Sequence, residues 1–158
     1  MSGNLYFEDF SVGRVFRTAG RTVTEADVVN FAGLSGDFSS LHLDEEFAVS
    51  GPFGRRIAHG LCSVTIFSGL FVQLGLWNDT ALAVLSTSWT FVGPVFLGDT
   101  IKADITVSHA RITSRGDRGV VTFEVTLANQ DGDTVQNGVW VMMIRALADS
   151  SKHQLENA

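Results

Sequence analysis

The sequence predicts an α+β fold in which one antiparallel sheet is wrapped around a single long helix. Two patterns predict this fold. The first is a run of apolar and small residues over 61–76, apolar on nearly every side, which is typical of a buried helix. Such a helix has to pack across one face of a sheet. The second is a strict alternation of apolar and polar residues that recurs, between turn signals, at 85–91, 101–108, 121–127 and 139–143.

The segments that precede the long helix are shorter. Residues 14–23 have extended character and predict a fifth strand. Thr24 and Asp27 have the spacing of a capping box, which predicts that a helix begins there. Gly33 and Gly36 are expected to end this helix, because glycine commonly terminates helices.

Two further elements complete the expected fold. Residues 44–48 predict another short helix, with its acidic residues at the favourable N-terminal end. In the last strand, 139–143, apolar residues occupy both registers, which predicts burial on both faces.

Composition limits the classes of protein that fit. At 158 residues the chain is long enough for one domain with a substantial core, which we expect to span residues 1–149, followed by a polar tail at 150–158. Hydrophobic residues make up 45% and charged residues 18%, as in a globular protein. A formal net charge of −6 argues against a nucleic-acid-binding protein. It leaves room for an anionic ligand held by a local arginine patch.

The cellular setting is expected to be the cytoplasm. Cys62 is the single cysteine, so no internal disulfide can form, and a reducing compartment fits. It lies in an apolar run and is expected to be an inert buried thiol. No secretory signal is evident at the N-terminus. The run at 61–76 is shorter than a bilayer span and carries polar residues, so no membrane association is expected.

Two stretches concentrate the groups that could perform chemistry. Asp37 and His42 lie five residues apart in an expected loop, and His59 and Gly60 open the long helix. Taken alone, Asp37 is most simply a turn residue, His42 a structural histidine and Gly60 an element boundary. Their joint occurrence favours a proton-transfer pair that faces a helix N-terminus.

Four stretches of the sequence form a recognisable set: Gly-Asp-Phe-Ser-Ser-Leu-His at 36–42, Ile-Ala-His-Gly at 57–60, Phe-Leu-Gly-Asp-Thr at 96–100 and Asn-Gln-Asp-Gly at 129–132. They resemble the MaoC-like dehydratases, also called R-specific enoyl-CoA hydratases, and the similarity extends from about residue 6 to residue 145. One departure is clear: this family's loop usually reads Asp-x-Asn-Pro-x-His, and Ser39 and Ser40 stand at the Asn and Pro positions.

The resemblance implies a hot-dog fold and the reversible hydration of a trans-2-enoyl-CoA to an (R)-3-hydroxyacyl-CoA, as in fatty acid metabolism. It implies that Asp37 and His42 hold and activate water and that the Gly60 N–H stabilises charge on the thioester oxygen. Ser68 matches a polar position of this family that supports the site. Coenzyme A would enter only as part of the substrate, and no cofactor or metal is implied.

Further residues and a partner follow from the same resemblance. Ser39 and His59 are expected to contact substrate, and His59 could instead only orient the loop. Arg55 and Arg56 would suit the phosphates of coenzyme A, although paired arginines are usually just solvated. Members of this family associate through their sheets, which implies a homodimer or a higher homo-oligomer.

Three alternatives remain open from the sequence. A hydratase specialised for a branched or dicarboxylic acyl-CoA would keep Asp37 and His42 and differ in its pocket. A hot-dog acyl-CoA thioesterase would direct water at the thioester carbonyl instead of Cβ. A noncatalytic acyl-CoA-binding subunit is the non-enzyme reading, and the Ser39-Ser40 departure is its best support.

Overall fold

The computed structural model describes residues 4–147 of the chain, and the predicted tail at 150–158 lies outside them. The elements follow one another much as the sequence predicts, with short helices before the long helix and long strands after it. In chain order they are η1 (Phe7–Asp9), β1 (Val15–Arg17), β2 (Arg21–Thr22), α1 (Glu25–Ser35), α2 (Ser40–Leu43), α3 (Glu45–Val49), α4 (Gly60–Gln73), β3 (Ala81–Phe91), β4 (Thr100–Ile112), β5 (Arg118–Ala128) and β6 (Thr134–Arg145).

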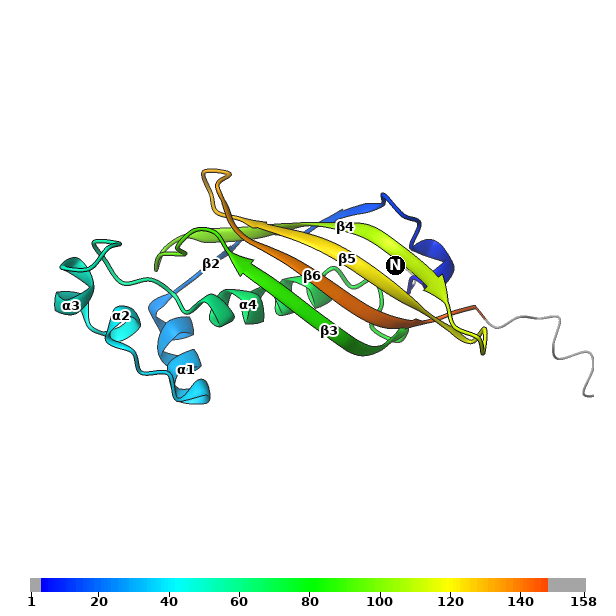
Figure 1. The fold of residues 1–158 in the computed structure, drawn as a ribbon, viewed down its shortest axis with the longest axis horizontal. Coiled ribbons are helices and arrows are strands. Elements are labelled where there is room, and N and C mark those ends of the chain that lie inside the picture. Colours follow the sequence, from blue (N-terminus) through cyan, green and yellow to red (C-terminus); the bar gives the residue numbers. More distant parts are fainter. Residues whose placement is uncertain (1–3, 148–158) are drawn as a thin grey trace, which may run out of the picture.

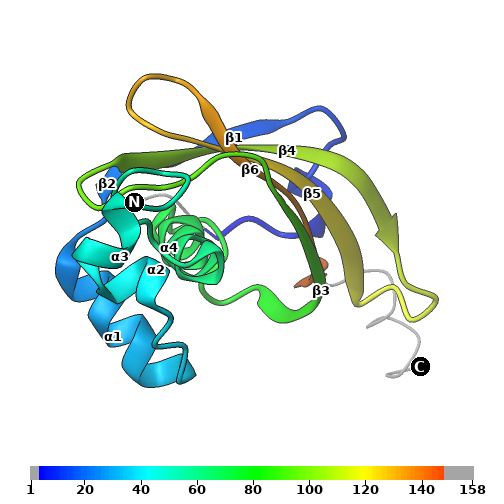
Figure 2. The same cartoon turned by 60° about the vertical axis from the view of Figure 1, so that its left-hand side comes forward.

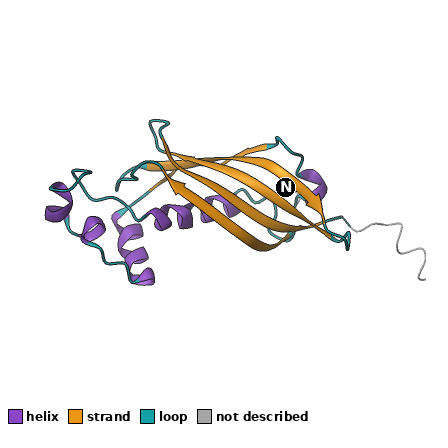
Figure 3. Ribbon diagram, in the orientation of Figure 1, coloured by secondary structure: helices purple, strands orange, loops and turns teal. Residues whose placement is uncertain are grey.

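The strands form one antiparallel sheet in the order β1-β4-β5-β6-β3, and β2 pairs with the other end of β4 (Figures 1 and 3). The sheet curves around α4, which Figure 2 shows nearly end-on in the hollow. This is the hot-dog arrangement. Among the described residues, no helix has both the length and the apolar character needed to cross a bilayer.

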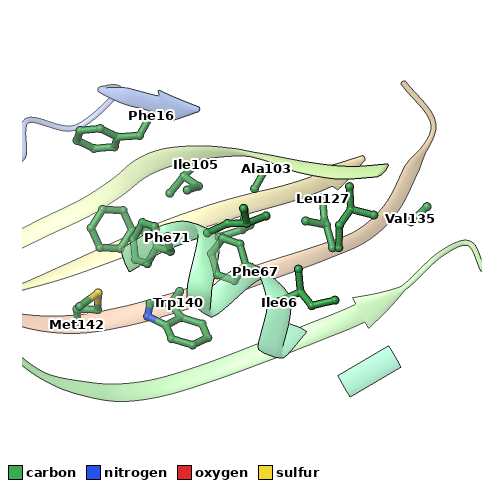
Figure 4. Close-up of a cluster of buried hydrophobic side chains, with 14 of the residues drawn as sticks. Phe16, Ile66, Phe67, Phe71, Ala103, Ile105, Leu127, Val135, Trp140 and Met142 are labelled. Carbon is green, nitrogen blue, oxygen red and sulfur yellow. The ribbon is translucent and has the colours of Figure 1, made fainter. Parts of the chain in front are cut away.

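The core lies between α4 and the concave face of the sheet. Phe67 and Phe71 project from α4 toward Trp140 on β6, with ring centroids 5.5 and 6.4 Å from that indole (Figure 4). The inward residues of β4 and β5 alternate as expected, and each is buried: Ile101, Ala103, Ile105, Val107, Val121, Phe123, Val125 and Leu127.

The burial predicted for α4 and β6 is partly wrong. One face of α4 is exposed, with Leu61 61% and Val72 55% accessible, so the helix is buried on one side only. On β6, Trp140 is buried, but Val139 and Val141 on the opposite register are only half-buried. Periodicity indicates which side chains are apolar, and it does not indicate which of them a single chain can cover.

The short helices lie together at one end of the sheet, beside the N-terminus of α4 (Figure 1). The capping box of α1 is confirmed, because the Thr24 and Asp27 side chains each bond the other's backbone N–H. Helix α1 runs through Gly33 and is capped by Gly36. The φ of +79° at Gly36 lies in the left-handed region, which glycine adopts without strain because it has no side chain. Gly33 was therefore wrongly expected to end the helix.

Candidate active site

The segment after α1 presents the Asp37 carboxylate in a tight local turn. One carboxylate oxygen, Oδ1, accepts a hydrogen bond from the Ser39 N–H at 3.2 Å, which is the pattern of an Asx turn. Ser39 is the N-cap residue of α2 but its hydroxyl makes no capping bond. Ser39 thus holds the Asp37 carboxylate through its backbone N–H.

His42 is the third residue of the four-residue helix α2, and does not lie in the loop where the sequence predicted it. Its Nδ1–H donates to the backbone carbonyl of Ile57 at 2.8 Å. Because a carbonyl only accepts, Nδ1 carries the proton of this bond, and Nε2 is the ring nitrogen left for other partners.

His59 holds the two segments together. It is 3% exposed, and its Nε2–H donates to the backbone carbonyl of Asp37 at 2.9 Å. Its ring lies on that of His42, with centroids 3.8 Å apart and planes tilted by 32°. One carboxylate oxygen of Asp37 and one ring nitrogen from each histidine lie within 4.8 Å of one another. The fold thus brings His59 together with Asp37 and His42, which precede it by 17 residues or more, in one cluster.

The cluster offers three groups that can transfer protons or hold an ion. Each imidazole uses one nitrogen on a backbone carbonyl, which leaves His42 Nε2 and His59 Nδ1 outside these bonds. Asp37, His42 and His59 are the residues that would hold an ion here.

Gly60 begins α4 beside the cluster and lines a cavity of about 430 Å³ together with His42. We call this the catalytic cavity; Phe91, Val95 and Gln136 also line it. N–H groups in the first turn of a helix lack partners within the helix and point outward, so the Gly60 N–H is a ready hydrogen-bond donor. A Cβ at Gly60 would lie 2.7 Å from the ring of Phe91, so glycine allows this close packing.

Gln136 is a residue of the site that the sequence interpretation missed. It is 1% exposed, lines the catalytic cavity from β6, and its Nε2 donates to the Gly60 carbonyl at 3.2 Å. This bond ties the sheet to the first residue of α4. A signal existed, because Gln136 is a polar residue in the inward register of β6, the register of Trp140.

The two arginines have different surroundings. The Arg55 guanidinium lies over the ring of Phe96, 3.8 Å from its centroid, and its side chain stays exposed. Arg56 instead bonds Glu25 of α1 and Glu45 of α3, at 2.8 and 2.7 Å. The hydrogen bond from Arg56 lowers the pKa of the Glu25 carboxyl. Arg56 is thus occupied in joining two helices, and Arg55 remains the candidate for phosphates.

Ser68 is not brought to the cluster within one chain. It lies two turns after Gly60, about 12 Å along the helix axis. It lines a separate cavity of about 300 Å³ with Phe71 and Trp77. Cys62, also on α4, is 3% exposed, and burial raises the pKa of its thiol, which fits the inert thiol expected.

The fold and the cluster define a MaoC-like protein. A family model described as "MaoC like domain" matches residues 9–129, and the chain belongs to this family. It is similar to the (R)-specific enoyl-CoA hydratase of Aeromonas caviae, with 34% identity over 119 residues, covering 75% of this chain and 84% of that protein.

Two other relatives are matched over a smaller share of their length. Protein MaoC of Klebsiella aerogenes is 41% identical over 107 residues, which is 68% of this chain and 32% of that protein. The 3-hydroxybutyryl-CoA dehydratase of Methylorubrum extorquens is 38% identical over 106 residues, which is 66% of this chain and 65% of that protein. The chain thus spans between a third and two thirds of these relatives.

Solved structures agree with this assignment. The MaoC-like dehydratase from Rhodospirillum rubrum superposes with a TM-score of 0.80 at 28% identity, covering 90% of this chain and 98% of that one. The monoamine oxidase regulatory protein of Archaeoglobus gives 0.81 at 34% identity, covering 92% and 98%. A Mycobacterium tuberculosis protein described as a double hotdog fold, 24% identical with a TM-score of 0.77 over 92% of this chain and 46% of that one, supports the fold alone.

Proposed function

We propose that the protein catalyses the reversible hydration of a trans-2-enoyl-CoA to an (R)-3-hydroxyacyl-CoA. The observation that carries the proposal is the meeting of Asp37 and His42 beside Gly60, the first residue of α4, at the edge of the catalytic cavity. The (R) configuration rests on relatives named (R)-specific enoyl-CoA hydratases, from Aeromonas caviae and Rhodospirillum rubrum.

In the proposed reaction, Asp37 and His42 hold one water between them. As the water oxygen bonds to Cβ, one of its protons passes to this pair, and the pair delivers a proton to Cα. The elements of water are thereby added across the double bond, and the pair returns to its starting protonation state. The Nε2 of His42, which the bond to Ile57 leaves for other partners, suits it to take part in such transfers.

Negative charge develops on the thioester oxygen as the hydroxyl adds to Cβ. The Gly60 N–H is proposed to donate to this oxygen, aided by the N-terminal end of the α4 dipole. Such a donor typically lowers the barrier by about 3–4 kcal/mol. Gln136 holds the same residue from the carbonyl side, which is expected to keep its N–H in place.

The coenzyme A portion and a second subunit complete the proposal. Arg55, exposed near the catalytic cavity, is proposed to contact the phosphates. A homodimer is expected because β3 is an edge strand with exposed apolar side chains, among them Val84 at 49% and Leu85 at 46%.

The proposal is tested by mixing purified protein with crotonyl-CoA. Loss of the conjugated double bond without release of free thiol is the expected result. Thiol release would indicate a thioesterase and overturn the proposal. Binding without turnover of crotonyl-CoA and of longer, branched and dicarboxylic enoyl-CoAs would indicate an acyl-CoA-binding subunit.

A further inference from the structure

Two cavities follow one another along the groove between α4 and the sheet. The catalytic cavity is lined by Gly60 and Ser63 at the start of α4 and by Phe91 at the end of β3. A second cavity, which we call the distal cavity, is the one of about 300 Å³ that Ser68 and Phe71 line from the later turns of α4. Residues 81–84, at the start of β3, form its other wall.

The same order holds on β6, because Gln136 lines the catalytic cavity while Trp140 and Met142 line the distal one. Neither lining includes Phe67 on α4, Trp89 on β3 or Gly138 on β6, which lie between the two sets of lining residues. We call these three the intervening residues.

The intervening residues form a single wall, centred on Trp89. Its indole meets the Phe67 ring edge-on, with centroids 5.2 Å apart, and it lies so close over Gly138 that a Cβ there would be 2.6 Å from the ring. The indole Nε1–H donates to Thr87 Oγ1 at 2.6 Å, and that hydroxyl donates to the Val139 carbonyl at 3.1 Å. Glycine at 138 and this pair of bonds hold the indole across the groove.

Figure 4 shows the α4 side of this wall, where Phe67 reaches from the helix toward Trp140. An acyl-CoA that reacts beside Gly60 keeps its charged portion at the exposed surface with Arg55, so its apolar end must extend inward. Along the groove, an inward chain meets Trp89 before it reaches the distal cavity.

We propose that Trp89 is the end wall of the acyl pocket and restricts the protein to short-chain enoyl-CoA substrates, with the distal cavity closed off behind it. This inference rests on the proposed function and adds the substrate class. Each methylene that a pocket accepts raises kcat/KM by about fourfold, so even two additional methylenes in the distal cavity would give more than about tenfold.

The test compares crotonyl-CoA, with four acyl carbons, and trans-2-decenoyl-CoA, with ten, as substrates of the wild type and of Trp89→Ala. The wild type is expected to prefer crotonyl-CoA by more than about tenfold in kcat/KM. Trp89→Ala is expected to raise kcat/KM for decenoyl-CoA by at least about tenfold and to change that for crotonyl-CoA by less than about threefold.

Two control variants make the test specific. Trp89→Phe keeps an aromatic ring against Phe67 and is expected to retain the preference for crotonyl-CoA. Met142→Ala enlarges the distal cavity but leaves the indole in place, so it should give no gain with decenoyl-CoA. Thermal melts followed by circular dichroism show whether each variant is folded.

The inference is overturned if the wild type accepts decenoyl-CoA as well as crotonyl-CoA, if folded Trp89→Ala gains nothing, or if Met142→Ala gains as much. Should Trp89→Ala not fold, Trp89→Leu takes its place with the same expected gain. If no enoyl-CoA is hydrated at all, the proposed function fails, and titration calorimetry with butyryl-CoA and decanoyl-CoA then decides the inference. Trp89→Ala should lower the dissociation constant of decanoyl-CoA by about tenfold and leave that of butyryl-CoA unchanged. Equal dissociation constants for decanoyl-CoA in the wild type and in Trp89→Ala would contradict the inference.

Discussion

At the scale of single residues, backbone contacts position the reacting groups. The Ile57 carbonyl holds Nδ1 of His42, and the Asp37 carbonyl anchors His59. The Gln136 side chain donates to the carbonyl of Gly60, the first residue of α4, and so holds that residue in place. The sequence named Asp37, His42 and Gly60 as candidate site residues, and the structure brings them close together. Their carbonyl partners come from the fold and have no signal in a motif.

Gln136→Leu is expected to lower kcat by about tenfold with little change in KM, because losing one buried hydrogen bond loosens the Gly60 donor in the transition state. Steady-state kinetics with crotonyl-CoA measure both constants. Gln73→Leu, an exposed position at the end of α4, is the matched control and should match the wild type. An equal loss in both variants, or a change in KM alone, would contradict a positioning role for Gln136.

Ser40→Pro is expected to raise the free energy of unfolding by about 0.4–1 kcal/mol. Ser40 is the first residue of α2, where proline is favoured, and Ser39 before it has φ −56° and ψ 135°, which a following proline tolerates. Urea unfolding measures the change. Ser39→Pro is the contrasting variant and should destabilise, because the Ser39 N–H bonds Asp37. The account of this loop would be wrong if the two variants changed stability alike.

At the scale of elements, the sequence predicted where strands and helices lie better than which of their faces are covered. The capping box of α1 and the alternation of β4 and β5 depend on local spacing, and both are confirmed. Which face of α4 is exposed, and which carboxylates pair with Arg56, depends on segments that are distant in sequence. Glu25 of α1 and Glu45 of α3 converge on Arg56 only in the folded chain.

The cap of α1 makes stability depend on acid pH. Burial alone would raise the pKa of Asp27, but hydrogen bonds from Thr24 and Arg21 outweigh it and lower the pKa below its ordinary value of 3.8. A carboxyl with a lowered pKa in the folded state stabilises the protein above pH 3.8 and loses this contribution as pH falls through the folded value.

Asp27→Asn is therefore expected to destabilise by about 0.5–2 kcal/mol at neutral pH, with the difference from wild type shrinking at strongly acid pH. Urea unfolding across a pH series measures it. The control is Asp104→Asn, which breaks an exposed ion pair with Arg17 and should change stability by at most about 1 kcal/mol. A pH-independent effect of Asp27→Asn would contradict the assigned role of the carboxylate.

At the scale of the whole molecule, one chain leaves apolar side chains exposed along β3, on the outer face of α4 and around the short helices. Among the described strands, β3 pairs only with β6, and one chain leaves most of its residues exposed. Exposed apolar edge strands favour pairing with another chain. The fold could be predicted because the periodicity that specifies it lies within one chain, whereas that periodicity does not indicate what covers the β3 edge.

The isolated protein is expected to have twice the mass of one chain in light scattering. Leu85→Lys places a charge on the β3 edge and is expected to shift the protein toward the monomer by at least about tenfold in dissociation constant. Leu34→Lys, on the exposed surface of α1, is the matched control and should remain a dimer. A monomeric wild type, or equal dissociation of both variants, would contradict association through β3.

The central claim is that Asp37 and His42 add water to an enoyl-CoA together. The most direct measurement is kcat/KM for crotonyl-CoA hydration by the wild type and by Asp37→Asn, a replacement of nearly the same shape. Removing a group that transfers protons is expected to lower kcat/KM by about 10²–10⁴-fold while the melting temperature stays close to that of the wild type. Hydration by a folded Asp37→Asn at the wild-type rate would show that this carboxylate does not perform the chemistry and would contradict the account.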